Sequence, residues 1–182
     1  PQLNESELPL IIIRDAMDRG GTEVFIHTKV HSAIFALVTS VLEQKGVDIA
    51  DARIIRSTDG YCFDSYIILD PDGNEVSSKQ EQHDIREIIH EKLTEMSTSD
   101  HEISRLPARQ LRHFTMKTDV QFDTDTRNQY TLMEVITADR AGLLASIGKA
   151  LNENKLQLHN ARISTFGARA EDLFYITDPD GE

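Results

Sequence analysis

The stretch TLMEVITADRAGLLASIGKALNENKLQLHNARISTFGARAEDLFYITDPDG, residues 131–181, repeats an earlier part of the same chain. The earlier copy occupies residues 22–73, begins TEVFIHTKV and ends YIILDPDG. The tripeptide Ala-Arg-Ile stands at 52–54 in the first copy and at 161–163 in the second. Two long copies, rather than many short ones, predict two homologous domains in tandem.

The spacing of apolar residues in the first copy predicts its secondary structure. It indicates a strand at 24–26, a helix over about 32–45, strands at 47–56 and 62–69, and a second helix that starts after residue 78. The pair Asp59-Gly60 is a hairpin signal between the last two strands, and Ser78 with Glu81 has the form of a capping box. This order predicts an α+β fold in which helices cover one face of an antiparallel sheet.

A four-stranded ferredoxin-like βαββαβ unit needs one more strand than this pattern supplies. Candidates precede each copy: residues 10–13 before the first, and residues 113–116 with 120–122 before the second. The sequence leaves open whether each of these strands completes the sheet of its own domain or that of its neighbour.

Domain limits follow from residues 97–110, a polar stretch with a proline that is typical of a linker. We expect a first domain at 1–96 and a second at 111–182. The second copy stops at Glu182, where the first copy begins its second helix, so we expect the second domain to lack its last helix. The chain also starts at Pro1, which suggests a piece of a longer protein.

Composition excludes several classes of function. The 182 residues carry 31 acidic side chains against 19 lysines and arginines, a formal net charge of −12. This balance argues against binding to nucleic acid or to an anionic membrane surface, since both need a basic face. No apolar run reaches the length of a membrane span, and the single cysteine, Cys62, rules out an intramolecular disulfide. We therefore expect a cytoplasmic protein.

The sequence contains no motif for catalysis. The seven histidines show no metal-ligand spacing with cysteine. No phosphate-binding loop, dinucleotide fingerprint or nucleophile elbow occurs. We therefore expect no enzymatic activity, no metal and no cofactor in this chain.

The turn between the first strand and helix of the second copy is the best candidate for a ligand site. It contains Asp139, Arg140, Ala141, Gly142, Leu143 and Leu144. Asp139 suits the N-cap of the helix, and Gly142 lets a ligand approach the backbone closely. A free amino acid fits this turn, because its carboxylate suits a helix N-terminus and its ammonium suits Asp139. The alternative is a capped turn without a ligand.

The strand that we expect to face this turn contributes His159 and Asn160 to the candidate site. The first copy has His31, Ser32, Ala33 and Ile34 at the place of the turn, so both the acid and the glycine are lost. We expect a degenerate site there, with Ser32 as a helix cap.

Two charged pairs recur between the copies. Arg53 and Asp64 of the first copy return as Arg162 and Asp172 of the second. On adjacent strands these residues are expected to form cross-strand ion pairs, which set the register of the strands rather than bind a ligand.

The D-R-x-G-L-L turn at 139–144, placed between the first strand and helix of a βαββαβ unit, resembles the ACT domain, a small regulatory module that senses amino acids. The resemblance extends over nearly the whole chain. The segments RGGTEVFI (19–26), LRHFT (111–115), GLLASIGKAL (142–151), HNARIST (159–165) and AEDLFYIT (170–177) together resemble the C-terminal part of the bifunctional uridylyltransferase/uridylyl-removing enzymes of bacterial nitrogen regulation.

This resemblance implies a regulatory region that binds L-glutamine and controls the enzyme that uridylylates and deuridylylates the PII signalling protein. In that family, glutamine favours uridylyl removal and inhibits uridylyl transfer. The resemblance also implies partner catalytic domains outside this chain, a nucleotidyltransferase and an HD hydrolase, which use Mg²⁺ or another divalent metal.

The first copy departs from the D-R-x-x-L-F pattern of the family, so the resemblance places glutamine at the second turn. If the two ACT domains pair side by side, within or between chains, we expect the first copy to form part of the wall of this glutamine site. Two alternatives stay open: a structural or interaction module without a ligand, and an ACT tandem of another amino-acid-responsive regulator.

Overall fold

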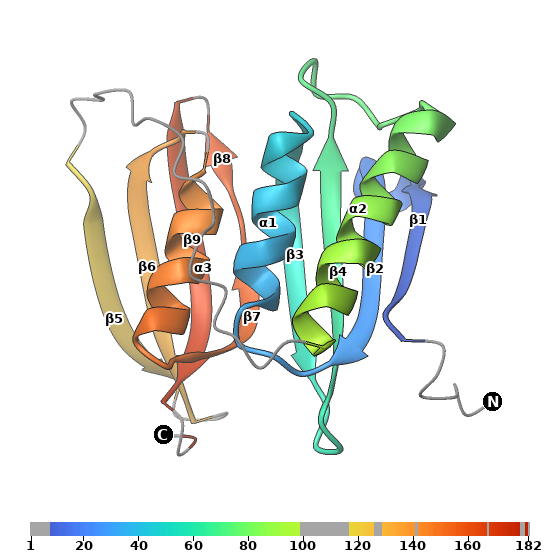
Figure 1. Cartoon of the computed structure of the whole chain (residues 1–182). Coiled ribbons are helices and arrows are strands. Elements are labelled where there is room, and N and C mark those ends of the chain that lie inside the picture. Colours follow the sequence, from blue (N-terminus) through green and yellow to red (C-terminus); the bar gives the residue numbers. More distant parts are fainter. Residues whose placement is uncertain are drawn as a thin grey trace.

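The computed structural model describes residues 8–98, 117–125, 129–140, 142–166, 168–178 and 181, which form two α+β units side by side (Figure 1). The first unit contains β1 (Leu10–Ala16), the 3-10 helix η2 (Met17–Arg19), β2 (Gly21–Lys29), α1 (Ile34–Gln44), β3 (Asp48–Arg56), β4 (Tyr61–Leu69) and α2 (Lys79–Thr98). The described part of the second contains β5 (Asp119–Asp125), β6 (Tyr130–Ala138), α3 (Leu143–Glu153), β7 (Gln157–Arg162), β8 (Thr165–Phe166) and β9 (Arg169–Thr177).

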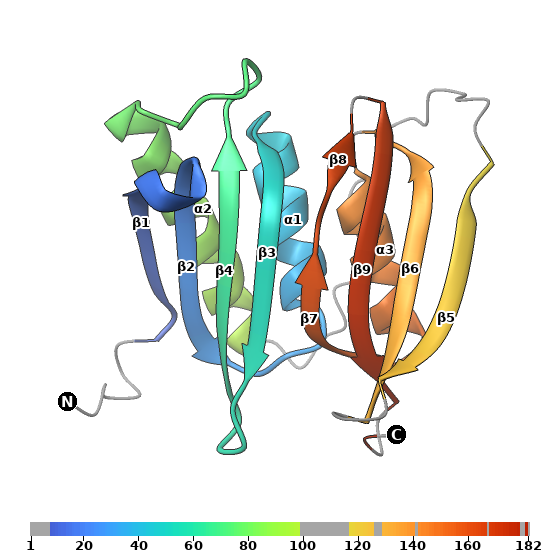
Figure 2. The same ribbon diagram turned by 180° about the vertical axis from the view of Figure 1, so that it is seen from behind.

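Both sheets are antiparallel and share one strand order. The order is β1-β2-β4-β3 in the first sheet and β5-β6-β9-β7 in the second, where the short strand β8 also pairs with β9. Helices α1, α2 and α3 lie on one side of the two sheets, and the strands are open to view on the other side, with β3 next to β7 (Figure 2). The predicted class, two ferredoxin-like α+β units with helices on one face of an antiparallel sheet, is confirmed.

Each outer strand pairs within its own unit, which answers a question that the sequence left open. β1 pairs with β2, and β5 pairs with β6. Because β1 precedes the rest of its unit, the order of the first unit is ββαββα, a circular permutation of βαββαβ. Residues 120–122 belong to β5, whereas the other candidate, 113–116, lies outside the described residues.

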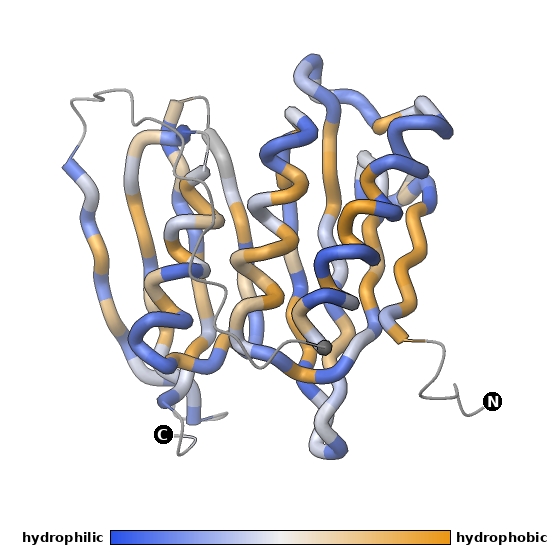
Figure 3. The backbone as a smooth tube through the Cα atoms, in the orientation of Figure 1, coloured by the Kyte–Doolittle hydropathy of each residue, from blue (hydrophilic) through white to orange (hydrophobic). Residues whose placement is uncertain are grey.

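Helix α2 begins as its capping box predicts. The backbone N–H of Glu81 donates to Oγ of Ser78 at 3.2 Å. The helix runs to Thr98, so residues 97–98 of the predicted linker are helical, and the linker over 99–110 stays a prediction outside the described residues. Hydrophilic and hydrophobic segments alternate along α2 (Figure 3). Within the described ranges, no helix combines the length and the hydropathy needed to cross a membrane.

One hydrophobic core runs through both units. Helix α1 lies at its centre, in contact with α2 on one side and α3 on the other, and residues 34–42 are all buried. This burial matches the composition of these nine residues, in which only Thr39 and Ser40 are polar. Phe35 of α1 meets Phe174 of β9 edge-to-face, with 6.2 Å between ring centroids. The two units therefore share packing that neither would have alone.

Helices α1 and α3 approach closely at Gly148. A Cβ atom on Gly148 would lie 2.9 Å from the Cα of Ala36 and 2.9 Å from Cδ1 of Phe35. The Cα of Ala36 cannot move without the rest of α1. The absent side chain of Gly148 therefore sets the distance between the two helices, and with it the distance between the units.

Gly148→Ala is expected to destabilise the chain by about 1–3 kcal/mol, because the added methyl group overpacks the contact with α1. In an ordinary helix interior the same change would stabilise by up to about 1 kcal/mol, so the sign of the effect is diagnostic. Urea denaturation followed by circular dichroism measures it, with the exposed Lys149→Ala as the control in the same helix. A Gly148→Ala chain at least as stable as the wild type would contradict this packing.

The predicted cross-strand ion pairs are wrong. Arg53 lies opposite Ser65, one residue along from Asp64 in β4. Successive strand residues point to opposite faces of a sheet, so Arg53 is exposed while Asp64 is only 1% exposed beneath the helices. The second copy repeats this arrangement, with Arg162 exposed and Asp172 buried.

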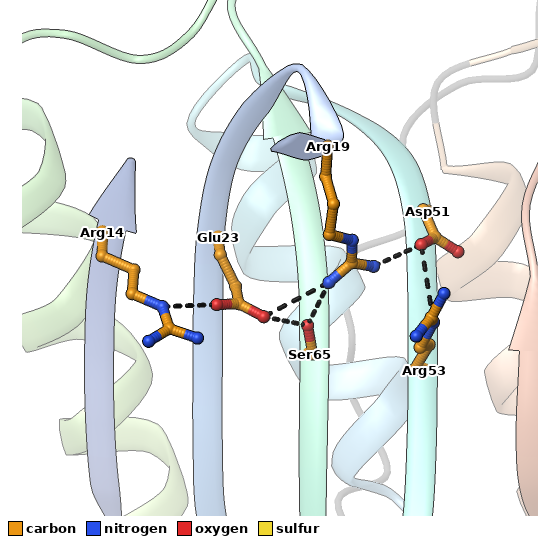
Figure 4. A network of polar contacts seen from close by, with 6 residues as sticks. All are labelled: Arg14, Arg19, Glu23, Asp51, Arg53 and Ser65. Carbon is orange, nitrogen blue, oxygen red and sulfur yellow. Dashed lines mark hydrogen bonds and ion pairs between the residues drawn. The ribbon is translucent and has the colours of Figure 1, made fainter. Parts of the chain in front are cut away.

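A polar network occupies the open face of the first sheet instead (Figure 4). Its members are Arg14, Arg19, Glu23, Asp51, Arg53 and Ser65. Glu23 accepts hydrogen bonds from Arg14 and Ser65, each at 2.6 Å, and from Arg19 at 3.3 Å. Burial alone would raise the pKa of Glu23, but the hydrogen bonds outweigh it and the pKa lies below its usual value. Three guanidinium groups and two carboxylates alternate across the neighbouring strands, so we assign the network to holding the strands together.

Candidate functional site

A cavity of about 470 Å³ opens between the two units. The second unit lines it with the turn between β6 and α3 and with part of β9. The first unit lines it with the end of α1 and the start of β3. Its volume falls within the range of roughly 300–1,000 Å³ that is usual for small-molecule sites, and it needs both units to form its walls.

The turn that the sequence marked as a ligand site lies in the wall of this cavity. The lining residues from the turn are Asp139, Arg140, Gly142, Leu143 and Leu144. Ala141, the remaining member of the predicted turn, lies outside the described residues. The structure thus brings together the predicted residues of the turn that it describes.

The predicted cap of α3 is wrong, because Gly142 occupies the cap position and no side chain caps the helix. The carboxylate of Asp139, three residues earlier, accepts from the backbone N–H of Arg140 instead. Gly142 has φ of +79°, a left-handed conformation that favours glycine. A Cβ there would also lie 3.2 Å from both carboxylate oxygens of Glu43 in the first unit. The conformation favours glycine at this position, and an added side chain would also have to displace the Glu43 carboxylate by a few tenths of an ångström.

The two strand residues predicted to face the turn do not line the cavity. His159 Nε2 lies 2.9 Å from Oγ1 of Thr177, and its ring stacks on Tyr130 with 4.7 Å between centroids. Asn160 is exposed. The register of β7 shifts between Leu158 and Asn160, so simple alternation does not assign the faces of this strand. The second unit faces the cavity with β9 instead.

Three acidic residues in the lining were not assigned to the site by the sequence. Glu43 and Asp48 come from the first unit, and Asp172 comes from β9. Only the packing of one unit on the other brings Glu43 and Asp48 to the turn, and no local pattern reports such packing. Asp172 did carry a signal, because it recurs as Asp64 at the same place in the first copy.

The lining is strongly acidic, with four carboxylates against the single guanidinium of Arg140. Burial raises the pKa of Asp139, and the nearby charge of Asp48 raises it further. Burial also raises the pKa of Asp172 to about 6, although the backbone N–H of Ser164 donates to its carboxylate. Ionised carboxylates are therefore costly here unless a positive charge accompanies them. The cavity favours a ligand that carries one.

The corresponding place in the first unit is filled. His31 and Ile34 line a space of only about 10 Å³ there, together with Arg56 of β3 and Leu158 of β7. The Nε of Arg56 donates to the backbone oxygen of Leu158 at 2.7 Å, a bond that crosses from one unit to the other. The predicted degenerate site is thus closed by a residue that the sequence did not single out.

The cap predicted for α1 is also wrong. Helix α1 begins at Ile34 with Ala33 in the cap position, and the predicted cap, Ser32, precedes it by one residue. The backbone N–H of Ala33 donates to Nδ1 of His31 at 3.1 Å. Burial lowers the pKa of His31, and the charge of Arg56 adds to this effect. Both favour the neutral ring, which can accept this hydrogen bond.

Among the residues that the structure describes, no cluster of three or more His, Cys, Asp or Glu is suited to hold a metal ion. Cys62 lies buried in β4. Burial, with the charge of Asp64, raises the pKa of its thiol to about 12. The thiol therefore stays protonated at neutral pH and behaves as a small apolar side chain.

Comparison with known proteins gives matches to curated relatives, whereas no family model and no solved structure matches the chain. A bifunctional uridylyltransferase/uridylyl-removing enzyme of Vibrio cholerae serotype O1 is 40% identical over 177 residues, which cover 97% of this chain and 20% of the relative. The enzyme of the same name from Methylococcus capsulatus is 40% identical over 171 residues, covering 94% and 20%. That from Pseudomonas syringae pv. syringae is 38% identical over 174 residues, covering 93% and 19%.

The chain therefore spans about one fifth of the length of these relatives. The matches cover almost all of the chain, including both copies of the repeat. Over nearly its whole length, this chain is homologous to one part of the bifunctional uridylyltransferase/uridylyl-removing enzymes.

Proposed function

We propose that this chain is the glutamine-sensing regulatory region of a bifunctional uridylyltransferase/uridylyl-removing enzyme. The observation that carries the proposal is the acidic cavity between two homologous ferredoxin-like units. The ACT-like turn at 139–144 forms part of its wall. The relatives supply the name of the parent enzyme, and the cavity supplies the reasons to place an amino acid in it.

A free amino acid is complementary to the two sides of this cavity. Its ammonium group matches the carboxylates of Asp48, Asp139 and Asp172. Its carboxylate matches the first turn of α3 at Leu144, which lines the cavity. The N–H of Leu143 already donates to the backbone oxygen of Arg140 at 3.1 Å. The N–H groups of a first helical turn have no acceptor within the helix, and the helix dipole there favours an anion.

Charge also favours glutamine over glutamate. A glutamate side chain would bring a further carboxylate to a lining that already holds four, whereas the side-chain amide of glutamine adds no charge. Like charges in a site of low dielectric repel strongly. We therefore expect glutamate to bind much more weakly than glutamine.

Regulation follows from the position of the cavity between the units. A ligand that contacts α1, β3, β9 and the turn together stabilises one arrangement of the two units over others. Allosteric coupling of this kind is typically worth roughly 1–3 kcal/mol. We propose that the coupling acts on the catalytic domains of the same enzyme, outside this chain, and changes their two activities on PII in opposite directions.

L-Glutamine is expected to bind the chain saturably in a calorimetric titration, and Gly142→Val is expected to weaken this binding by at least about tenfold. Valine strongly disfavours φ of +79°, and its side chain would meet Glu43 at the cavity wall. The matched control is Gly60→Val, at φ of +87° with no atom within 4 Å of its added Cβ. It imposes similar backbone strain away from the cavity and should leave the affinity unchanged.

A folded wild-type chain that gives no heat with glutamine would contradict the proposed ligand. Equal loss of affinity in Gly142→Val and Gly60→Val would show a general effect of strain rather than a contact with the ligand. A chain that binds no amino acid at all would support the interaction-module alternative, in which the shared core of the two units is the whole function.

A further inference from the structure

We infer that Asp172 recognises the positive charge of the ligand, so that the cavity selects small molecules with a free primary ammonium group. The inference rests on the proposed function, because it takes the cavity to hold a ligand. It goes further by naming one acceptor residue and the chemical group of the ligand that this residue binds.

Asp172 carries a carboxylate oxygen that the protein leaves without a partner. The residue is 1% exposed and lines the cavity. Its Oδ1 accepts from the backbone N–H of Ser164 at 3.2 Å, but Oδ2 has no hydrogen-bond donor among the described residues. An unsatisfied buried polar atom is costly, and a buried charge is more so. A ligand that donates to Oδ2 would remove this cost.

In the first unit, a positive charge from within the chain accompanies the aspartate at the same position. Asp64 occupies the place of Asp172, is also 1% exposed, and also has a carboxylate oxygen without a hydrogen-bond donor among the described residues. Burial raises the pKa of Asp64, and the charge of Arg56 opposes that rise. Arg56 therefore supplies the counter-charge for Asp64, and both residues line the small cavity of the first unit.

The second unit has no cation at the position equivalent to Arg56. Arg56 lies opposite Cys62, which is two residues before Asp64. Thr165 lies opposite Ala170, which is two residues before Asp172. Thr165 therefore stands at the position of Arg56 and carries no charge. The replacement accompanies the larger cavity, about 470 Å³ against about 10 Å³.

The contact that Arg56 makes also has a counterpart at the larger cavity. Arg56 donates to the backbone oxygen of Leu158, and the repeat aligns Leu158 with Ile49, which lines the cavity. A ligand ammonium group placed like the Arg56 guanidinium would thus meet both the Asp172 carboxylate and the strand carrying Ile49. At this position the first unit carries its own cation, and in the second unit a ligand from solution supplies one, while Arg140 lines another part of the cavity wall.

The test compares Asp172→Asn with Asp64→Asn, two isosteric changes at equivalent buried positions. Each chain is titrated by calorimetry with L-glutamine, N-acetyl-L-glutamine, L-glutamate and the other L-amino acids. We expect the wild type to bind glutamine and not its N-acetyl form, which has no ammonium group. Asp172→Asn should weaken glutamine binding at least tenfold, whereas Asp64→Asn should change it less than threefold.

The outcomes separate this inference from the proposed function. Glutamine binding that survives Asp172→Asn, or equal binding of N-acetyl-L-glutamine, would overturn the inference and leave glutamine sensing intact. Binding of a different amino acid that depends on Asp172 would support the inference and overturn glutamine as the ligand. Failure of every amine in the panel to bind a folded wild-type chain would overturn both.

Discussion

Arg56→Met is expected to destabilise the chain by about 2–4 kcal/mol at pH 8, because it leaves the buried carboxylate of Asp64 without its counter-charge. It also removes the hydrogen bond from Arg56 to Leu158 that joins the two units. Methionine retains much of the length of the arginine stem, so lost packing contributes little. Urea denaturation measures the free energy of unfolding.

The loss of stability caused by Arg56→Met should depend on pH, because Asp64 is ionised only at higher pH. Burial raises the pKa of this group to about 7 even with Arg56 present, and without Arg56 it must rise further. At pH 5 Asp64 is therefore protonated in both chains, and only the hydrogen bond to Leu158 is lost, about 1 kcal/mol. At pH 8 the wild type holds an ionised Asp64 beside Arg56, whereas the variant must retain a proton or bury a lone charge.

Arg53→Met is the matched control for this prediction, since Arg53 lies on the same strand but is exposed. It should cost no more than about 1 kcal/mol at either pH. In the Asp64→Asn background, the extra destabilisation by Arg56→Met at pH 8 should disappear. An Arg56→Met effect that is equal at pH 5 and pH 8 would contradict the assigned role of Arg56.

Asp172→Asn is expected to raise the free energy of unfolding by about 1–3 kcal/mol at pH 8 while removing ligand binding. The folded pKa of Asp172 is raised from 3.8 to about 6. The ionised form is therefore disfavoured in the folded chain, and wild-type stability falls as the pH rises from about 4 to about 6 on account of this group. Asparagine removes the charge and keeps an oxygen to accept from Ser164.

The increase in the free energy of unfolding caused by Asp172→Asn should vanish at pH 4, because Asp172 is already protonated in the folded wild type at that pH. Denaturation curves at pH 4 and pH 8 measure this difference. A chain that becomes more stable as it loses its ligand is the expected signature of a binding residue kept at a cost to stability. Loss of stability at pH 8 would instead show that Asp172 has a partner within the protein, and would remove the reason to assign it to a ligand.

The repeat and the hydrophobic spacing were sufficient to predict the architecture. The apolar spacing of α1, the hairpin at Asp59-Gly60 and the capping box of α2 involve residues close together in the sequence, which local sequence patterns report well. The partner of each outer strand could not be predicted this way. It depends on contacts between segments far apart in the chain, and β1 and β5 are compatible with either sheet until those contacts form.

The turn that lines the cavity could be singled out from the sequence, but the rest of the cavity wall could not. Asp139 and Gly142 adjoin a strand and a helix in a recognisable order, and both line the cavity. Glu43 and Asp48 reach the cavity only because the first unit packs on the second. His159 was misplaced because the register shift in β7 interrupts the alternation on which the prediction relied. From the sequence, Gly142 is explained by the close approach of a ligand. In the structure the carboxylate of Glu43 lies close to this glycine.

Arg56 and Asp172 show a further limit of local patterns. Arg56 stands at the end of an alternating strand, where a charged side chain is usually solvated, and nothing nearby in sequence indicates that it reaches Leu158. The recurrence of Asp64 as Asp172 was visible, but it pointed equally well to a surface ion pair. Only the register of the strands shows that the aspartates and the arginines of the repeated motif lie on opposite faces.

An NMR titration of the ¹⁵N-labelled chain with L-glutamine shows whether an amino acid binds between the two units. We expect saturable shifts in the backbone amides of Gly142 and Leu144 in the second unit, and of Gly46 and Asp48 in the first, all of which line the cavity. The amide of Gly60 should not move. Shifts confined to one unit, shifts centred on residues 31–35, or a spectrum unchanged by glutamine would contradict binding between the units.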